Sequence, residues 1–373
     1  MYDWIDSPDA LRARLQAWQA RGVDRVALDT EFIRERTYYP QLALVQLAVS
    51  GGDPAPEILL VDTLVPGMGD ALRPLLLDPA VTKLMHSASE DLQALARGAG
   101  AVPAPLFDTQ VAAAMTGYGA GLGYQKLVEA VTGTQLEKGE TRSDWLRRPL
   151  SESQMRYAAE DVVHLHELHD VLRAKLRELG REAWLAEDTE RAVGNARNDV
   201  DDPHPHLALR NAERFDVPAQ ARLCRLLRWR DAQARVLDRP RSWLLDNDLA
   251  AILARRVPAD FDEFSGLLDR HPKAPRKARG ELWKIVSAPL TEQELAIPPI
   301  RVAESGDKQA LKDLQQEVAG VAAGLSLPEG LLCSRRHLER LLEGRGWPNA
   351  LEGWRRGLLE AALAPKLPPA PPA

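Results

Sequence analysis

Short hydrophobic runs in the first half of the chain alternate with helical patterns. Each run is bounded by polar or turn-forming residues, which is typical of sheet strands. The predicted strands are Arg25–Leu28, Leu42–Val49, Glu57–Asp62, Val81–His86 and Leu106–Asp108. The predicted helices between and after them are Asp70–Leu77, Glu90–Arg97, Thr109–Met115 and Gly123–Val131. The closely spaced early strands predict antiparallel hairpins and the later alternation predicts parallel additions, so we expect a mixed sheet flanked by helices.

A longer helical pattern follows the predicted sheet. It runs from about Ser151, a good N-cap residue, to Leu179, with Gly180 as the stop. Residues 195–206 are polar and contain two prolines, which is typical of a linker. Beyond them, alanine, leucine and arginine recur at spacings of three and four, broken by prolines. This pattern predicts an all-helical second half.

A weak internal repeat divides the helical half. An apolar pair, a capping residue and a leucine-rich helix occur at Leu244–Asp246 and again at Leu332–Ser334. The repeat predicts two copies of one small helical module. We therefore expect an α/β domain over 1–194, a linker over 195–207, helical domains over 208–290 and 300–364, and a disordered tail over 365–373.

The composition is that of an ordinary water-soluble protein, with 45% hydrophobic and 27% charged residues. No apolar run is long enough to span a membrane and no leader is evident, so we expect a cytoplasmic protein. The net charge of −6 argues against a protein that coats nucleic acid by bulk attraction. The segment 221–284 is nevertheless basic, with 15 Lys/Arg against 9 Asp/Glu, which fits either phosphate docking or a solvated helix face.

Cysteine and histidine show no metal-site pattern. Cys224 and Cys333 lie far apart in apolar surroundings, so we expect two buried thiols. The spacing of His164, His166 and His169 places only the last two on one helix face, and we expect these histidines to be structural or exposed.

Two acidic residues end the first predicted strand. Asp29 and Glu31 are two positions apart, so both side chains project from one face of a strand that begins Val-Ala-Leu. Such a pair can consist of ordinary loop residues. At the end of a hydrophobic strand, however, unpaired carboxylates are costly to bury, and a divalent cation offsets that cost.

Two further acidic positions follow in helical contexts. Asp91 begins a helix after a predicted strand, where it can cap the helix or bind a cation, and the neighbouring Glu90 fits equally well by spacing. Tyr157 and Asp161 lie four residues apart and share a largely apolar helix face. Asp161 therefore needs a partner, either an arginine or a metal ion.

In this order the acidic residues resemble the three motifs of the DEDD exonuclease superfamily. The resemblance assigns Asp29 and Glu31 to the first motif, Asp91 rather than Glu90 to the second, and Tyr157 with Asp161 to the third. It implies a ribonuclease-H-like fold, in agreement with the mixed sheet. It also implies that the four acids hold two Mg²⁺ ions, with Mn²⁺ as an alternative, and that Tyr157 is the fifth catalytic residue.

The chain resembles the ribonuclease D family over nearly its whole length. The stretches that carry the likeness are Asp29–Phe32 with Arg34–Leu42, Met85–Leu92, Lys138–Leu146 with Arg148–Leu150, and Trp229–Arg230 with Ser242–Leu245. The last of these resembles the helicase-and-RNase-D C-terminal (HRDC) domain, which implies two HRDC-type modules. The resemblance implies 3′→5′ hydrolysis of RNA to 5′-mononucleotides, with precursor tRNA and other small structured RNAs as substrates. No membrane or protein partner is predicted.

Basic and aromatic side chains near the motifs are candidates for holding the RNA. Arginine binds phosphate and aromatic rings stack on bases, although surface-loop or solvated roles fit the same residue types. The candidates are Arg34, Arg36, Tyr38, Tyr39, Lys138, Arg142, Trp145 and Arg148. Two other functions remain open: a DNA-directed 3′→5′ exonuclease, which typically carries histidine where this chain has Tyr157, and a non-catalytic nucleic-acid-binding adaptor.

Overall fold

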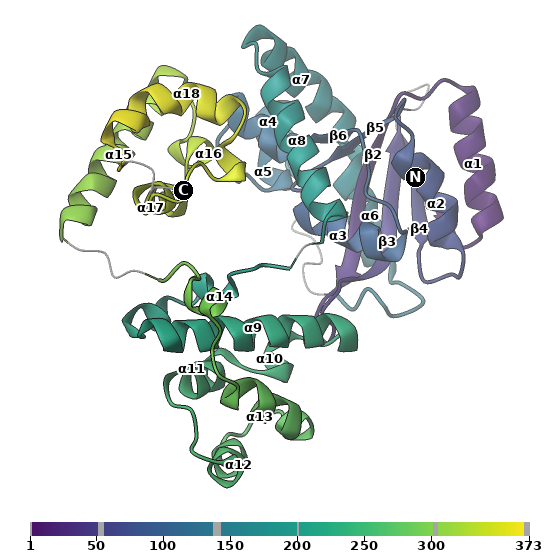
Figure 1. The fold of residues 1–373 in the computed structure, drawn as a ribbon. Helices are drawn as coiled ribbons and strands as arrows, with labels where there is room; N and C mark the ends of the chain where they lie inside the picture. The colour runs from purple at the N-terminus through teal and green to yellow at the C-terminus, as the bar shows by residue number, and fades with distance from the viewer. Residues whose placement is uncertain (1, 51–55, 137–142, 200, 301–304, 369–373) are drawn as a thin grey trace. The chain divides into compact units, whose positions relative to one another are not determined.

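The computed structural model describes the whole chain except residues 1, 51–55, 137–142, 200, 301–304 and 369–373. The predicted substrate residues Lys138 and Arg142 therefore lie outside the described residues. The chain forms two compact units (Figure 1). The first comprises Met1–Ile33, Gln41–Asn198 and Glu304–Ala373, and the second comprises Arg34–Pro40 and Asp199–Ala303.

The first unit is built on a six-stranded mixed sheet. Its strands are β1 (Tyr2–Ile5), β2 (Arg25–Ile33), β3 (Gln41–Val49), β4 (Glu57–Asp62), β5 (Thr82–Met85) and β6 (Leu106–Asp108), in the order β1-β4-β3-β2-β5-β6. The strands β2, β3 and β4 pair antiparallel, whereas β1, β5 and β6 are added in parallel. The predicted early hairpins and later parallel strands are confirmed.

Helices pack on both faces of this sheet and continue beyond it. They are α1 (Pro8–Ala20), α2 (Met68–Leu77), α3 (Ser89–Gly98), α4 (Thr109–Met115), α5 (Tyr124–Thr132), α6 (Glu152–Val163), α7 (Leu165–Glu178) and α8 (Glu182–Arg197). The four helices predicted between and after the strands are all present. The N-terminal β1 and α1 were not predicted; β1 is only four residues long and lies at the edge of the sheet.

Alternating side chains of each strand enter two separate cores. Leu28 and Leu59 pack with α1, α2 and α3, while the adjacent Ala27 and Leu60 pack with α4 to α7. The helix α8 reaches both cores, with Leu185 in one and Val193 in the other. The two faces of the sheet are therefore covered by different helices and share α8.

The long helix predicted over residues 151–179 is wrong in one respect, because it is two helices. Ser151 caps α6 as expected, through a capping box with Gln154. At His164 the helix breaks, and α7 starts with a new run of hydrogen bonds. The hydroxyl of Tyr124 enters the helical ladder at this point, by accepting from the His164 backbone N–H and donating to the Glu160 carbonyl.

The C-terminal helices belong to the first compact unit. They are α15 (Ser305–Gly324), α16 (Glu329–Leu332), α17 (Arg335–Leu342) and α18 (Trp354–Leu363), with short 3₁₀ turns at Asn349–Leu351 and Ala364–Lys366. The indole rings of Trp184 and Trp354 stack with centroids 4.6 Å apart. Asp188 accepts from the Trp354 indole N–H and from the Arg355 guanidinium, which joins α8 to α18. These contacts join α18 to the unit that contains the sheet, while the predicted division into domains stays a prediction.

The regular structure in the described residues of the second unit is entirely helical. Its helices are α9 (Val217–Leu237), α10 (Arg241–Leu244), α11 (Asn247–Arg255), α12 (Phe261–Arg270), α13 (Arg279–Ser287) and α14 (Glu292–Leu295), with 3₁₀ turns at Pro205–Ala208, Arg210–Arg214 and Arg276–Ala278. In the predicted linker, the first residues still belong to α8, which ends at Arg197.

The internal repeat has the same backbone in both units. A four-residue helix ends at a buried extended residue, which is Leu245 after α10 and Cys333 after α16. The next residue then caps a longer helix, with Asp246 before α11 and Ser334 before α17. The spacing that predicted two copies of one module therefore corresponds to one local structure formed twice.

Other predictions from residue types also have outcomes in the structure. Cys224 and Cys333 are buried free thiols, as predicted. His166 is buried and donates from Nε2 to the Ala48 carbonyl, and His169 is buried against Phe107. Among the helices of the described residues, none is long and apolar enough to cross a membrane.

Candidate metal centre

The strand β2 presents two carboxylates on one face. Asp29 and Glu31 follow the buried residues Val26–Leu28, and both side chains are partly buried. In the described part of the chain, the ladder between β5 and β2 covers Arg25–Ala27, so Asp29 lies beyond its end. A register shift on the β3 side directly follows Glu31. Bulges of this kind often adjust side chains near active sites.

The third carboxylate comes from the last turn of α6, on the face of the sheet that α6 covers. Ligand oxygens of Asp29, Glu31 and Asp161 all lie within 4.8 Å of one another. One turn earlier, the Tyr157 phenol lies close enough to the Asp161 carboxylate for the two groups to shift each other's pKa, as their spacing of four allows. Segments far apart in the sequence thus bring three acidic groups and a phenol together.

The fourth carboxylate reaches the cluster from α3. Asp91 is buried in the first turn of that helix, whereas its neighbour Glu90 is exposed. The hydroxyl of Thr30, from the position between Asp29 and Glu31, donates to Asp91. Asp91 lies outside the tight group of three but close enough to raise the pKa of both Asp29 and Glu31. The structure therefore places all four predicted acids at one end of β2.

The pKa of every carboxyl group in the cluster is raised. Burial is the main cause, and it raises the pKa of Glu31 to about 8 and those of Asp91 and Asp161 to about 7. Burial and the charges of the other three acids raise the pKa of Asp29 well above its usual range. Burial also raises the pKa of the Tyr157 phenol, which therefore stays protonated.

These residues fit a divalent cation. No ion pair joins the four carboxylates to an arginine or lysine within the part of the chain that the structure describes. Four adjacent acids without a cationic partner are unfavourable when ionised. Carboxylate oxygen is the ligand type that Mg²⁺ and Mn²⁺ prefer, and a bound cation would remove the repulsion.

Comparison with known proteins identifies the family. Residues 2–177 match a family model described as a 3′-5′ exonuclease. A ribonuclease D of Xanthomonas oryzae is 54% identical over 98% of this chain and 99% of its own length. The chain belongs to the ribonuclease D family. A ribonuclease D of Pseudomonas paraeruginosa is 37% identical over 96% of each chain.

A solved structure agrees with this assignment. The crystal structure of Escherichia coli RNase D, described as an exoribonuclease involved in structured RNA processing, aligns with a TM-score of 0.83 and 30% identity over 98% of each chain. Membership in the ribonuclease D family makes this chain an exoribonuclease, that is, a hydrolase of RNA phosphodiester bonds.

Two predicted substrate residues of this ribonuclease D have internal partners instead. Arg148 makes a two-bond ion pair with the buried Asp62 and donates to the Ala43 carbonyl, the residue at the register shift of β3. Trp145 is 4% exposed, and its ring lies 6.2 Å from that of Tyr157. The structure therefore favours structural roles for both side chains over direct RNA contact.

The loop between β2 and β3, which was predicted to bind RNA, belongs to the helical unit. Backbone N–H groups of Tyr38 and Tyr39 donate to Asp238, each at 3.0 Å. The Tyr38 ring is 6% exposed, and Arg235 and Arg241 pack against it with guanidinium carbons 5.2 and 4.8 Å from the ring centroid. Tyr38 is thus enclosed by arginines, while Arg34 and Arg36 are exposed.

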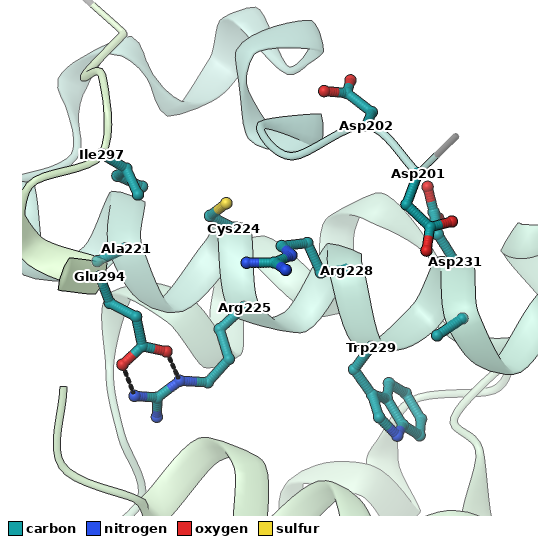
Figure 2. Close-up of a pocket in the computed structure, with 11 residues that line it drawn as sticks. Asp201, Asp202, Ala221, Cys224, Arg225, Arg228, Trp229, Asp231, Glu294 and Ile297 are labelled. Atoms are coloured by element: carbon teal, nitrogen blue, oxygen red, sulfur yellow. Dashed lines mark hydrogen bonds and ion pairs between the residues drawn. The ribbon is translucent and has the colours of Figure 1, made fainter. Parts of the chain in front are cut away.

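A cavity of about 320 Å³ lies in the second unit of this ribonuclease D, along α9 (Figure 2). The guanidinium of Arg225 is paired by two hydrogen bonds with Glu294 of α14, which ties the two helices together. Arg228 projects beside Cys224 in the same view. The acids of the candidate metal centre belong to the other unit. Among the residues that line this cavity, Cys224 was predicted to be a buried thiol and Trp229 lies in the stretch that resembles an HRDC domain.

Sequence reasoning missed three side chains that support the acidic cluster. Thr30 lies between the two acids of the first motif, so its position was visible but its hydrogen bond to Asp91 was not. His86 received no role, yet it hydrogen-bonds Thr109 and the Leu122 carbonyl beside the second motif. Tyr124 is far from every motif in sequence and carried no signal.

Proposed function

We propose that this ribonuclease D degrades RNA from the 3′ end by a two-metal mechanism and releases 5′-mononucleotides. Asp29, Glu31 and Asp161 would hold one Mg²⁺ ion, and Asp29 with Asp91 would hold the second. The observation that supports this assignment is the tight group of three carboxylates, with Asp91 adjoining Asp29 and Glu31. The bound cations would offset the negative charge that develops on the phosphate and would acidify the attacking water.

Tyr157 acts as a hydrogen-bond donor in this proposal. Its pKa is raised by burial and by the nearby carboxylates, so the phenol does not serve as a base near neutral pH. Its hydroxyl, which lies beside Asp161, would orient the attacking water. The nearby phenol lowers the pKa of Asp161 against the larger effect of burial.

The substrates we propose are precursor tRNA and other small structured RNAs with short 3′ extensions. The relative from Escherichia coli is described as taking part in structured RNA processing. We propose that the two helical modules are HRDC-type domains and that the first one contacts RNA. Two of its features support this role: the basic segment 221–284, and the Trp243 ring, which is 53% exposed with Arg239 packed against it.

A direct experiment follows Asp29→Asn and wild-type protein on an end-labelled structured RNA with a short 3′ extension. Wild type should shorten the extension one nucleotide at a time with Mg²⁺ and stop when chelator is added. Asp29→Asn should lose at least about 1,000-fold in rate even in excess Mg²⁺, because it removes the ligand shared by both cations. Substantial hydrolysis by the variant contradicts the metal role. Faster turnover of a matched DNA oligomer contradicts the RNA preference.

A further inference from the structure

The break between α6 and α7 has no cause in its own sequence. Residues 157–168 contain neither proline nor glycine, the usual residues at a sharp helix break. An uninterrupted helix would join the Glu160 carbonyl to the His164 N–H, its partner four residues later. The Tyr124 hydroxyl stands between these two groups, at 3.0 Å from the Glu160 oxygen and 3.1 Å from the His164 nitrogen. A side chain of α5 therefore replaces one bond of another helix.

The replaced bond spans a residue of the acidic cluster. Asp161 directly follows Glu160, so its peptide unit lies inside the turn that Tyr124 opens. We propose that Tyr124 is a positioning residue for the carboxylate cluster, because its hydroxyl fixes the last turn of α6 and thereby sets where the Asp161 oxygens lie relative to Asp29 and Glu31. The inference rests on the proposed metal-dependent function and concerns how this chain builds the site.

The position of Tyr124 is itself tied to the second acidic motif. The His86 and Tyr124 rings meet edge to face with centroids 5.7 Å apart. His86 Nε2 donates to the Leu122 carbonyl at 3.0 Å, and its Nδ1 hydrogen-bonds the Thr109 hydroxyl at 2.9 Å. His86 lies at the end of β5, just before α3. The segment before α5 is therefore braced by the strand that leads to the second motif.

The chain of contacts joins two motifs that are separate in sequence. From His86 it passes through Leu122 and Tyr124 to the Glu160 carbonyl. The phenol also lies close enough to Asp161 and Asp29 for both charges to act on it. Without the hydroxyl, the Glu160 carbonyl and the His164 N–H can bond directly. The last turn of α6 would then continue into α7 and carry Asp161 away from β2.

The test variant is Tyr124→Phe, which keeps the ring and its contact with His86 but removes the hydroxyl. The matched control is Tyr118→Phe, since Tyr118 is a partly buried tyrosine of the same unit whose ring packs against Lys175. Binding of Mn²⁺ to each RNA-free protein is measured by calorimetry. The kcat, the KM for RNA and the Mg²⁺ concentration giving half-maximal rate are measured separately.

For Tyr124→Phe we expect Mn²⁺ affinity to fall about tenfold or more, as is typical when a group that orients a metal ligand is lost. The Mg²⁺ requirement should rise in parallel, kcat should fall, and the KM for RNA should stay unchanged. Tyr118→Phe should match wild type in all four quantities. A Tyr124→Phe protein with lower thermal stability but wild-type Mn²⁺ affinity and Mg²⁺ requirement overturns the inference. Absence of Mn²⁺ binding by wild type itself would instead refute the proposed metal function.

Discussion

The hydroxyl of Thr30 donates to the carboxylate of Asp91, and this bond links β2 to α3. Thr30 points to the opposite face of β2 from Asp29 and Glu31, which lie on either side of it. Asp91 thus approaches the strand from its other face, beyond the end of the ladder with β5. The fourth acid is held in place by the one residue of the Asp-Thr-Glu motif that carries no charge.

Removing this bond should change the pH dependence of cation binding. The Thr30 hydroxyl lowers the pKa of Asp91 against the larger raising effect of burial. In Thr30→Val the pKa of Asp91 should therefore rise further, so half-maximal Mn²⁺ binding should require a higher pH, by about half a unit to one unit. Thr30→Ser keeps the hydroxyl and should behave as wild type. Identical binding curves for Thr30→Val and wild type would contradict this role of the hydroxyl.

Asp91 and Glu90 are adjacent acids for which we expect opposite outcomes. Asp91 is buried in the cluster and Glu90 is exposed. Asp91→Asn should lower the rate of RNA hydrolysis by about 100-fold or more, because the proposed second cation loses one of its two ligands. Glu90→Gln should stay within about threefold, since an exposed charge contributes little. Single-turnover rates in saturating Mg²⁺ provide the comparison. An equal loss of rate in both variants would show that Asp91 contributes no more to hydrolysis than Glu90.

The metal-free protein should become less stable as pH rises. The folded-state pKa values of Glu31, Asp91 and Asp161 are raised to about 8, 7 and 7, so ionisation is less favourable in the folded state than in the unfolded chain. Stability is therefore lost from the ordinary carboxylate range up to about pH 8.

Melting curves of wild type and Asp29→Asn in chelator separate this effect from other titrations. Asp29→Asn should melt about 2–5 °C higher than wild type near pH 8, and the gap should close near pH 4. Added Mg²⁺ should raise the melting temperature of wild type and leave the variant almost unchanged. If wild type instead became more stable between about pH 5 and pH 8 relative to the variant, the raised pKa values would be wrong.

Arg148 offers a test between a structural role and substrate binding. Its guanidinium pairs with Asp62, which is 7% exposed, and reaches the Ala43 carbonyl. Arg148→Ala should lower the free energy of unfolding by about 2–4 kcal/mol, because a buried carboxylate loses its partner. The exposed neighbour Arg147 provides the control, with an expected change below about 0.5 kcal/mol. Urea unfolding measures both. A stable Arg148→Ala protein with weakened, salt-dependent RNA binding would restore the substrate role.

Asp188 should be a principal residue in the attachment of the C-terminal helices. It accepts from Trp354 and Arg355 of α18 and from Arg191 of its own helix. Asp188→Ala should lower stability by about 2–4 kcal/mol and speed amide hydrogen exchange in α15 and α18. The exposed Glu190, on the same helix, is the matched control. If amide exchange in α18 is unchanged in Asp188→Ala, the stacked rings of Trp184 and Trp354 are sufficient to hold α18 against α8.

The sequence predicted those parts of the fold that local pattern determines. Strands β2 to β6 were identified because each is a continuous apolar run, and the sheet class follows from their spacing. The four acids and Tyr157 were predicted because residue spacing and family likeness agree, although spacing alone left Glu90 and Asp91 open. The structure favours Asp91, because only Asp91 is buried while Glu90 is exposed.

Local sequence patterns are insufficient where a distant residue decides the outcome. The break at His164 depends on Tyr124, forty residues earlier, so no local pattern contains it. Arg148 and Trp145 have the residue types that bind RNA, but those types also pair with a buried acid or fill a core. Sequence shows the donor or the ring without showing the partner, and here the partners are internal.

The position of α8 determines how this enzyme can be shortened. The exonuclease family model ends at residue 177, one residue before the end of α7. A fragment cut there would leave a hole on each side of the sheet, because Leu185 and Val193 fill different cores. The segment that matches the exonuclease family model, residues 2–177, therefore lacks side chains that both cores need. Fragments intended for crystallography or for transplanting the nuclease should retain α8, which ends at residue 197, together with the C-terminal helices that pack against it.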